Sequence, residues 1–118
     1  MKTAKQLLGN QSEDLAARYL QKAGYKIITK NYSCRQGEID LIAQEKDILV
    51  FVEVRSKRNQ HYGLPIETID KNKQMKIRKA AVNYLHQQHK NDCYCRFDVV
   101  TVLWNESKPQ ISLYRDAF

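Results

Sequence analysis

Apolar positions along the chain follow two different spacings, which separate the expected helices from the expected strands. They recur at helical spacing from about residue 11 to residue 23, before a stop at Gly24. The same spacing returns in a segment that Asp70 can cap and that ends near His89. β-Branched and aromatic residues gather in shorter runs, at 25–32, 37–43, 48–55, 95–103 and in QISLYR after Pro109. The pattern therefore predicts the order α-β-β-β-α-β-β.

This order predicts an α/β fold with one mixed sheet flanked by helices. The first three strands are joined by short connections and should form an antiparallel meander. The helix from 70 to 89 can carry the chain across the sheet, so that strand 95–103 joins the other edge. No repeat, low-complexity segment or long linker divides the 118 residues. We therefore expect a single domain spanning residues 1–118.

The second and third strands bring acidic residues into register. If their connection is a tight turn centred on Lys46 and Asp47, facing residue numbers sum to 93 and Asp40 lies opposite Glu53. Side chains alternate between the faces of a sheet, so each face should carry a different set. One set is Glu38, Asp40, Ile42, Phe51, Glu53 and Arg55; the other, expected to be core, is Ile39, Leu41, Ala43, Val50, Val52 and Val54.

Two carboxylates directly opposed in a sheet repel each other, so Asp40 and Glu53 require a compensating cation. Arg55 or a metal ion would serve. Opposed Cβ atoms lie roughly 4.5–5.5 Å apart, which lets two carboxylates hold one Mg²⁺ at about 2.0–2.1 Å. The alternative is a solvent-exposed strand face with weak cross-strand ion pairs, which is the commoner arrangement on spacing alone.

Composition adds a basic charge and few other constraints. Lys and Arg total 20 against 13 Asp and Glu, a formal net charge of +7, which fits a polyanionic partner without identifying it as nucleic acid. The chain has no apolar run long enough for a membrane span and no apolar stretch of a signal peptide near its start, so we expect a cytoplasmic protein without a membrane partner. The spacing of His86, His89, Cys93 and Cys95 does not match the usual zinc ligand pairs.

Several stretches together resemble a known family. They are EDLAARYLQKAGYKIITKNYSCRQGEIDLIA, ILVFVEVRSKR, KNKQMKIRKAAVNYL, RFDVV and the terminal AF. Over nearly its whole length the chain resembles the YraN-like family of uncharacterised bacterial proteins, which are related in pattern to archaeal Holliday junction resolvases. Asp40, Glu53 and Arg55 resemble the metal-site signature of the PD-(D/E)XK nuclease superfamily, in which a strand acid is followed by E-x-K.

The resemblance implies a restriction endonuclease-like core and a metal site. Asp40 and Glu53 would hold one or two Mg²⁺ or Mn²⁺ ions, and the carbonyl of Val54 would complete the inner shell. In the resolvase-like branch a glutamate early in the first helix also reaches the metal, and Glu13 matches that place. Read without the family, Glu13 instead forms a capping box with Asn10, three residues earlier.

The chain departs from the superfamily pattern at Arg55, where most members have lysine. A guanidinium stabilises a phosphate or a transition state but does not remove a proton, so the resemblance supports metal binding more strongly than cutting. Lys57 shares the strand parity and could substitute, although a solvated loop lysine is the simpler interpretation. The expected nucleic-acid-binding residues are Arg55, Lys57, Arg58, Lys71, Lys73 and Lys76.

The leading hypothesis is a Mg²⁺-dependent endonuclease that hydrolyses phosphodiester bonds in DNA, with branched or junction DNA suggested by the resolvase pattern and RNA left open. The first alternative is a nucleic-acid-binding module that keeps the fold and cuts nothing. The second is an interaction protein without a nucleic acid ligand. Symmetric cutting of a junction would require a homodimer. Asp98, in RFDVV, is interpreted as a structural acid paired with a neighbouring base.

Overall fold

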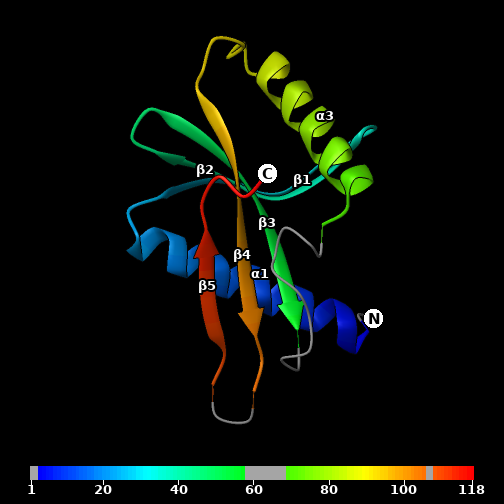
Figure 1. The fold of residues 1–118 in the computed structure, drawn as a ribbon, viewed down its shortest axis with the longest axis vertical. Helices are drawn as coiled ribbons and strands as arrows, with labels where there is room; N and C mark the ends of the chain where they lie inside the picture. The colour runs from blue at the N-terminus through cyan, green and yellow to red at the C-terminus, as the bar shows by residue number, and fades with distance from the viewer. Residues whose placement is uncertain (1–2, 58–68, 106–107) are drawn as a thin grey trace.

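The computed structural model describes residues 3–57, 69–105 and 108–118. In chain order its elements are α1 (Ala4–Lys22), β1 (Lys26–Cys34), β2 (Gly37–Glu45), β3 (Ile48–Lys57), α3 (Lys71–Gln87), β4 (Cys95–Leu103) and β5 (Gln110–Tyr114). The strands form one sheet in the order β1-β2-β3-β4-β5, in which β3 and β4 are parallel and every other pair is antiparallel. The predicted α/β fold, element order and crossover are confirmed (Figure 1).

Helices α1 and α3 cover opposite faces of the sheet. Leu20 of α1 packs in a cluster with Val52 and other residues of β2, β3 and β4. On the other face, Ile77 of α3 packs in a second cluster with Phe51 and Phe97. Figure 1 shows α1 crossing the strands on one side, while α3 lies over the β1–β2 end. None of the described helices is long and apolar enough to span a membrane.

Helix α1 begins earlier than predicted, and this corrects the expected cap at Asn10. The Gln6 amide donates to Thr3 Oγ1 at 3.2 Å, and the Thr3 amide donates to Gln6 Oε1 at 2.9 Å. This reciprocal pair forms a capping box whose N-cap, Thr3, lies about two turns before Asn10, so the polar cap signal at Asn10 lies inside the helix. The predicted stop is confirmed, because Gly24 adopts a φ of 99° directly after the C-cap.

The β2–β3 hairpin has the predicted register. Backbone partners run from Leu41 and Val52 to Glu45 and Ile48, and each pair sums to 93. Lys46 in the turn has a φ of 55°, as a tight hairpin turn requires. Regular pairing is recorded no further than Leu41, so Asp40 and Glu53 lie just past the end of the ladder.

The predicted placement of Ile39 with Leu41 is wrong, because side-chain alternation is broken at Asp40. Ile39 and Ile42 both pack in the α3 cluster, although an uninterrupted strand would place them on opposite faces. The β1–β2 pair is irregular at the same place, where Asn31 has a left-handed φ of 56° and regular pairing skips from Leu41 to Ile39. This local irregularity lets Asp40 leave the regular pattern of β2.

Gly37 allows α3 to pack closely on the start of β2. A Cβ at this position would lie 3.1 Å from the carbonyl oxygen and 3.3 Å from Cβ of Lys76. Both contacts are tighter than ordinary van der Waals packing, so a larger residue would push the helix away. The close contact holds the N-terminal half of α3 over the region that contains Asp40.

A second buried acid, Asp98, is satisfied by several donors. It is fully buried and accepts hydrogen bonds from the Tyr25 hydroxyl at 2.8 Å, Arg96 Nε at 3.0 Å and the Asp116 amide at 2.9 Å. Arg96 also donates to Glu45 Oε1 at 2.7 Å. The structural interpretation of Asp98 is therefore confirmed, and this network ties β2, β4 and the C-terminal residues together.

We predict that Asp98→Ala lowers the free energy of unfolding by about 2–4 kcal/mol, because buried donors lose their acceptor and the charge of Arg96 loses its buried partner. The matched control is Asp14→Ala, which removes an acid whose ion pair with Lys30 is largely exposed and should cost about 1 kcal/mol or less. Urea denaturation of both variants measures the difference. Equal losses would contradict the assignment of Asp98 as a buried anchor.

Candidate functional site

The structure brings Asp40 and Glu53 together, as the register predicted. Asp40 Oδ2 accepts a hydrogen bond from the Val54 amide at 2.8 Å, which turns the carboxylate toward β3. Glu53 lies on that strand with only 5% of its surface exposed. The alternative of a solvated strand face with loose ion pairs does not describe Glu53. We call these two residues the acidic pair.

Electrostatic strain is concentrated on Glu53. Burial, followed by the hydrogen bond with Asp40 and the negative charge of Asp40, raises the pKa of Glu53 to about 8. The positive charges of Lys73 and Arg55 act in the opposite direction. Two carboxylates therefore share one poorly solvated site in which a cation is favoured.

Lys73 supplies one of those charges from a different element. Its Nζ lies 3.6 Å from Glu53 Oε2. The Lys73 amide donates to the N-cap side chain of Asp70 at 2.8 Å, which places Lys73 in the first turn of α3. Sequence reasoning assigned Lys73 to phosphate binding, whereas the structure places its ammonium at the acidic pair.

Glu13 approaches the acidic pair from α1. Its pKa is raised to about 7, first by partial burial and then by the negative charge of Asp40, with smaller contributions from Asp14 and Glu38. A hydrogen bond with Asn31 acts against this shift. Glu13 therefore lies within electrostatic range of Asp40 and is not a helix cap, and its predicted contact with a metal stays a prediction.

Asn31 is a site residue that sequence reasoning missed. It contacts Glu13 and lines a hollow of about 150 Å³ together with Tyr32, Ser33, Glu38, Ile39 and Asp40. Asparagine tolerates the left-handed φ of 56° better than most residues. An asparagine in a β-branched run was the available signal, because it marks a break in regular pairing.

The remaining predicted residues divide by exposure. Arg55 is half-buried and close enough to Glu53 to affect its pKa. Lys57 at the end of β3, and Lys71 and Lys76 on α3, are exposed. Arg58 lies outside the described residues, so its predicted role stays a prediction. The Val54 amide holds Asp40, and the predicted ligand role of the Val54 carbonyl likewise stays a prediction.

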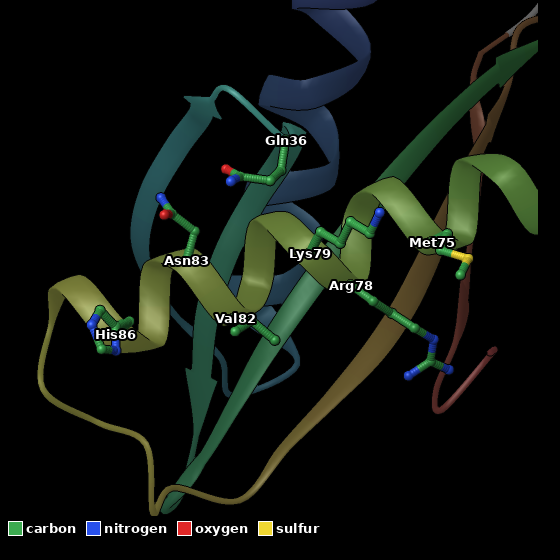
Figure 2. Close-up of a pocket in the computed structure, with 7 residues that line it drawn as sticks. All are labelled: Gln36, Met75, Arg78, Lys79, Val82, Asn83 and His86. Atoms are coloured by element: carbon green, nitrogen blue, oxygen red, sulfur yellow. The ribbon is translucent and has the colours of Figure 1, made fainter.

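A hollow larger than the one beside Asp40 lies elsewhere, along α3. It measures about 690 Å³ and is lined by Gln36, Met75, Arg78, Lys79, Val82, Asn83 and His86 (Figure 2). No residue of the acidic pair lines it. The guanidinium of Arg78 instead lies 4.7 Å from the ring centre of Phe97 and 5.7 Å from that of Phe118. Size alone therefore does not locate the candidate centre.

The acidic pair has the donor chemistry of a Mg²⁺ site. Magnesium prefers oxygen ligands and is commonly held by one or two carboxylates together with waters and substrate phosphates. In the described part of the chain, no three His, Cys, Asp or Glu residues form a compact group that could hold a metal by themselves. The residues present therefore fit a substrate-completed site and not a cage made wholly of protein ligands.

We predict that Glu53→Gln stabilises the metal-free protein at high pH. Because the folded-state pKa of about 8 exceeds the ordinary 4.5, the protonated form favours folding below the lower value, and this stability is lost as pH rises through the higher one. The melting temperatures of the wild type and the variant, measured in a chelator, should diverge between pH 5 and pH 9. At pH 9 the variant should melt about 3 °C or more above the wild type. A constant difference would contradict the raised pKa.

We predict that Asn31→Gly and Asn31→Ala have separable effects. Both remove the hydrogen bond to Glu13, so the pKa of Glu13 should rise in each, which NMR titration of its carboxyl carbon measures. Only alanine also strains the backbone at a φ of 56°, and it should cost about 1 kcal/mol more than glycine. An unchanged Glu13 pKa in the glycine variant would contradict the contact.

The chain is similar to many bacterial proteins. The model of "Uncharacterised protein family UPF0102" matches residues 12–102. A UPF0102 protein of Rhodococcus opacus is 48% identical over 94% of this chain and 95% of its own length, and one of Pelotomaculum thermopropionicum is 45% identical over 89% and 88%. One of Clostridium perfringens is 40% identical over 100% and 98%. These names state no activity, but the predicted YraN-like membership is confirmed: the chain belongs to the UPF0102 family.

Proposed function

We propose that this protein is a metal-dependent endonuclease that hydrolyses phosphodiester bonds in DNA at the acidic pair. The observation that supports this most is the juxtaposition of Asp40 with the buried Glu53, whose pKa is raised to about 8. A protein that needed only a stable sheet would gain from an apolar residue at either position. Shifted carboxylates held against each other are instead typical of sites that bind a cation or carry out acid–base chemistry.

Each residue of the site has a defined task in this proposal. Asp40, fixed by the Val54 amide, and Glu53, enclosed between β3 and α3, present oxygen ligands from two strands. Glu13, on α1, lies within electrostatic range of Asp40 and adds negative charge beside these two ligands. A bound Mg²⁺ or Mn²⁺ would lower the pKa of a water molecule and neutralise charge on the phosphate. As water loses a proton to solvent and adds to phosphorus, the bond from phosphorus to one sugar oxygen breaks, and that oxygen takes up a proton from solvent and leaves as a hydroxyl.

Lys73 can supply the ammonium that is missing from the strand because Arg55 replaces the usual lysine. The superfamily lysine that orients the attacking water is replaced by arginine, which does not act as a base. The Lys73 ammonium, 3.6 Å from Glu53, comes from α3 and can donate hydrogen bonds to a water or a phosphate oxygen beside the pair. In this proposal Lys73 performs the orienting role, and the Arg55 guanidinium offsets negative charge around Glu53.

Exposed basic residues near the site suit a DNA backbone. Lys57 ends β3, and Lys71 and Lys76 lie on the half of α3 whose N-terminus favours anions. The net charge of +7 adds long-range attraction to a polyanion. Branched DNA is the substrate we propose from the resolvase pattern, and two-fold cutting of a junction would then be carried out by a homodimer.

A second candidate function is a nucleic-acid-binding module that does not cut. The contact between Lys73 and Glu53 favours it, because the ammonium already compensates one of the two carboxylates without a metal. Arg55 in the place of the usual lysine also favours a module that binds without cutting, because a guanidinium does not remove a proton. The two functions share a basic surface and differ in whether the acidic pair turns over substrate.

We predict that the protein cuts DNA in Mg²⁺ or Mn²⁺ and that Asp40→Asn and Glu53→Gln each lower the rate at least about 100-fold. Asparagine at position 40 keeps an oxygen that can accept from the Val54 amide, so folding should be preserved. The substrates are supercoiled, linear, single-stranded and four-way-junction DNA, and RNA. Asp92→Asn, at an exposed acid that precedes β4 and lines neither the acidic pair nor a described hollow, is the control and should cut normally.

Cutting that survives both substitutions would show a contaminating nuclease and would reject the enzyme. Salt-dependent binding to DNA without cutting on any substrate would instead support the module, because neutralised phosphates make affinity fall with salt. Absence of binding at low salt would reject both functions.

We predict that Lys73→Met lowers the cutting rate more than tenfold while DNA affinity changes less than about threefold, because its ammonium acts at the acidic pair. Lys76→Met removes an exposed charge one turn along α3 and should instead weaken binding and spare the rate at saturating DNA. Single-turnover cutting and fluorescence anisotropy separate the two quantities. Matching effects of the two variants would contradict the role of Lys73.

A further inference from the structure

A separate hollow lies beside α1, and neither residue of the acidic pair lines it. It measures about 320 Å³ and is lined by Gln11, Asp14, Leu15, Arg18 and Trp104. Trp104 follows β4 directly and is the single tryptophan of the chain. The lining combines one large aromatic ring with amide, carboxylate and guanidinium groups. We call it the Trp104 hollow.

Trp104 is held in a fixed orientation. Its indole Nε1 donates to Ser12 Oγ at 2.9 Å and to Ser56 Oγ at 3.0 Å, and these two hydroxyls are themselves 2.9 Å apart. The Trp104 backbone amide donates to the Lys57 carbonyl at 2.7 Å. The polar edge of the ring is therefore bound inside the protein, Trp104 also packs against the α1 cluster, and part of the residue lines the hollow. A ring held this way binds a ligand with little loss of side-chain freedom.

We propose that the Trp104 hollow binds an unpaired nucleobase of a single-stranded nucleic acid. Trp104 supplies a stacking surface, which is a contact that any base can make. The Arg18 guanidinium can stack on the base or contact the adjoining phosphate. The amide of Gln11 and the carboxylate of Asp14 offer acceptors and donors to the edge of the base, as such groups do in base recognition.

The charge of the hollow favours a base over a phosphate alone. Asp14 places a carboxylate in the lining, which would repel an isolated anion. Lys30 lies 3.3 Å from Asp14 and Arg18 is exposed, so the surroundings still attract a strand that carries phosphates outside the hollow. Planar heterocycles with hydrogen-bonding edges satisfy both conditions.

The position of the hollow also bears on the substrate. Ser12, which binds the Trp104 ring, and Glu13, which contacts Asn31 beside Asp40, are consecutive on α1 and face different sides. The hollow and the acidic pair therefore flank one helix, which is about 10–12 Å across with its side chains. A substrate that occupies both would carry unpaired bases near the bond that is cut, as a branched DNA with a single-stranded flap does. This statement about the substrate rests on the proposed function, whereas base binding itself does not.

The test uses the fluorescence of Trp104 in the wild-type protein with EDTA, so that no metal-dependent cutting occurs. The probes are a mixed-sequence single-stranded DNA of 12 nucleotides and an abasic strand of equal length and charge. We expect the base-containing strand to quench Trp104 emission saturably and to bind about tenfold more tightly than the abasic strand. Equal affinity of the two strands, or an emission unchanged by the base-containing strand, would overturn the proposal.

Variants locate the binding within the hollow. Arg18→Gln should weaken binding of a dye-labelled strand about fivefold, whereas Lys22→Gln, which removes one exposed charge a turn further along α1, should change it less than twofold. Trp104→Phe keeps an aromatic ring and should retain the preference for bases over the abasic strand. Equal effects of Arg18→Gln and Lys22→Gln would assign the binding to charge alone and overturn the proposal.

These results remain distinguishable from the outcome of the cutting assays. Quenching by base-containing strands without cutting of any substrate would support the Trp104 hollow and reject the endonuclease. Cutting of duplex DNA without quenching by single strands would support the endonuclease and overturn the base-binding proposal.

Discussion

Coverage of both faces of the sheet is the constraint on which the rest of this structure depends. The parallel β3–β4 pair lies between α1 and α3, so its residues must be apolar on both sides. A charged side chain inside such a layer is tolerated only where polar partners or a break in pairing provide for it. Glu53 lies just past the end of the β2–β3 ladder, where Asp40 has left the regular strand pattern. The candidate centre is therefore located by the break in the sheet.

The two buried acids of the sheet show how the environment separates a structural role from a chemical one. Asp98 accepts hydrogen bonds from Tyr25, Arg96 and a backbone amide, and these donors compensate its burial. Glu53 is buried and faces a second carboxylate, and burial first and this carboxylate second raise its pKa. The hydrogen bonds of Asp98 stabilise the fold, whereas Glu53 and Asp40 repel each other when both are charged, and a cation would relieve that repulsion.

The contact between Lys73 and Glu53 changes how the departure at Arg55 is interpreted. In the sequence of β3 alone, the replacement of lysine by arginine at position 55 removes the group that orients the attacking water. In space, an ammonium from α3 reaches the same carboxylate. The Asp70 cap and the close packing of α3 on Gly37 place that helix. The chemistry of the site is thus assembled from residues twenty positions apart in the chain.

The sequence by itself determined the element order, the hairpin register and the pairing of Asp40 with Glu53, because hydrophobic periodicity and a two-residue turn are local properties. It misplaced the start of α1, since Thr3 and Asn10 both carry a capping signal and only the completed reciprocal bonds at Thr3 distinguish them.

The tertiary structure decided which side chains from separate elements meet. Beside the left-handed residue Asn31, Ile39 packs on the α3 face of the sheet. The packing of α3 places Lys73 at Glu53, and α1 places Ser12 where it accepts a hydrogen bond from Trp104. Such contacts depend on backbone irregularities and helix placement, which summed short-range preferences do not specify, and they provide the residues that make an acidic hairpin a candidate active centre.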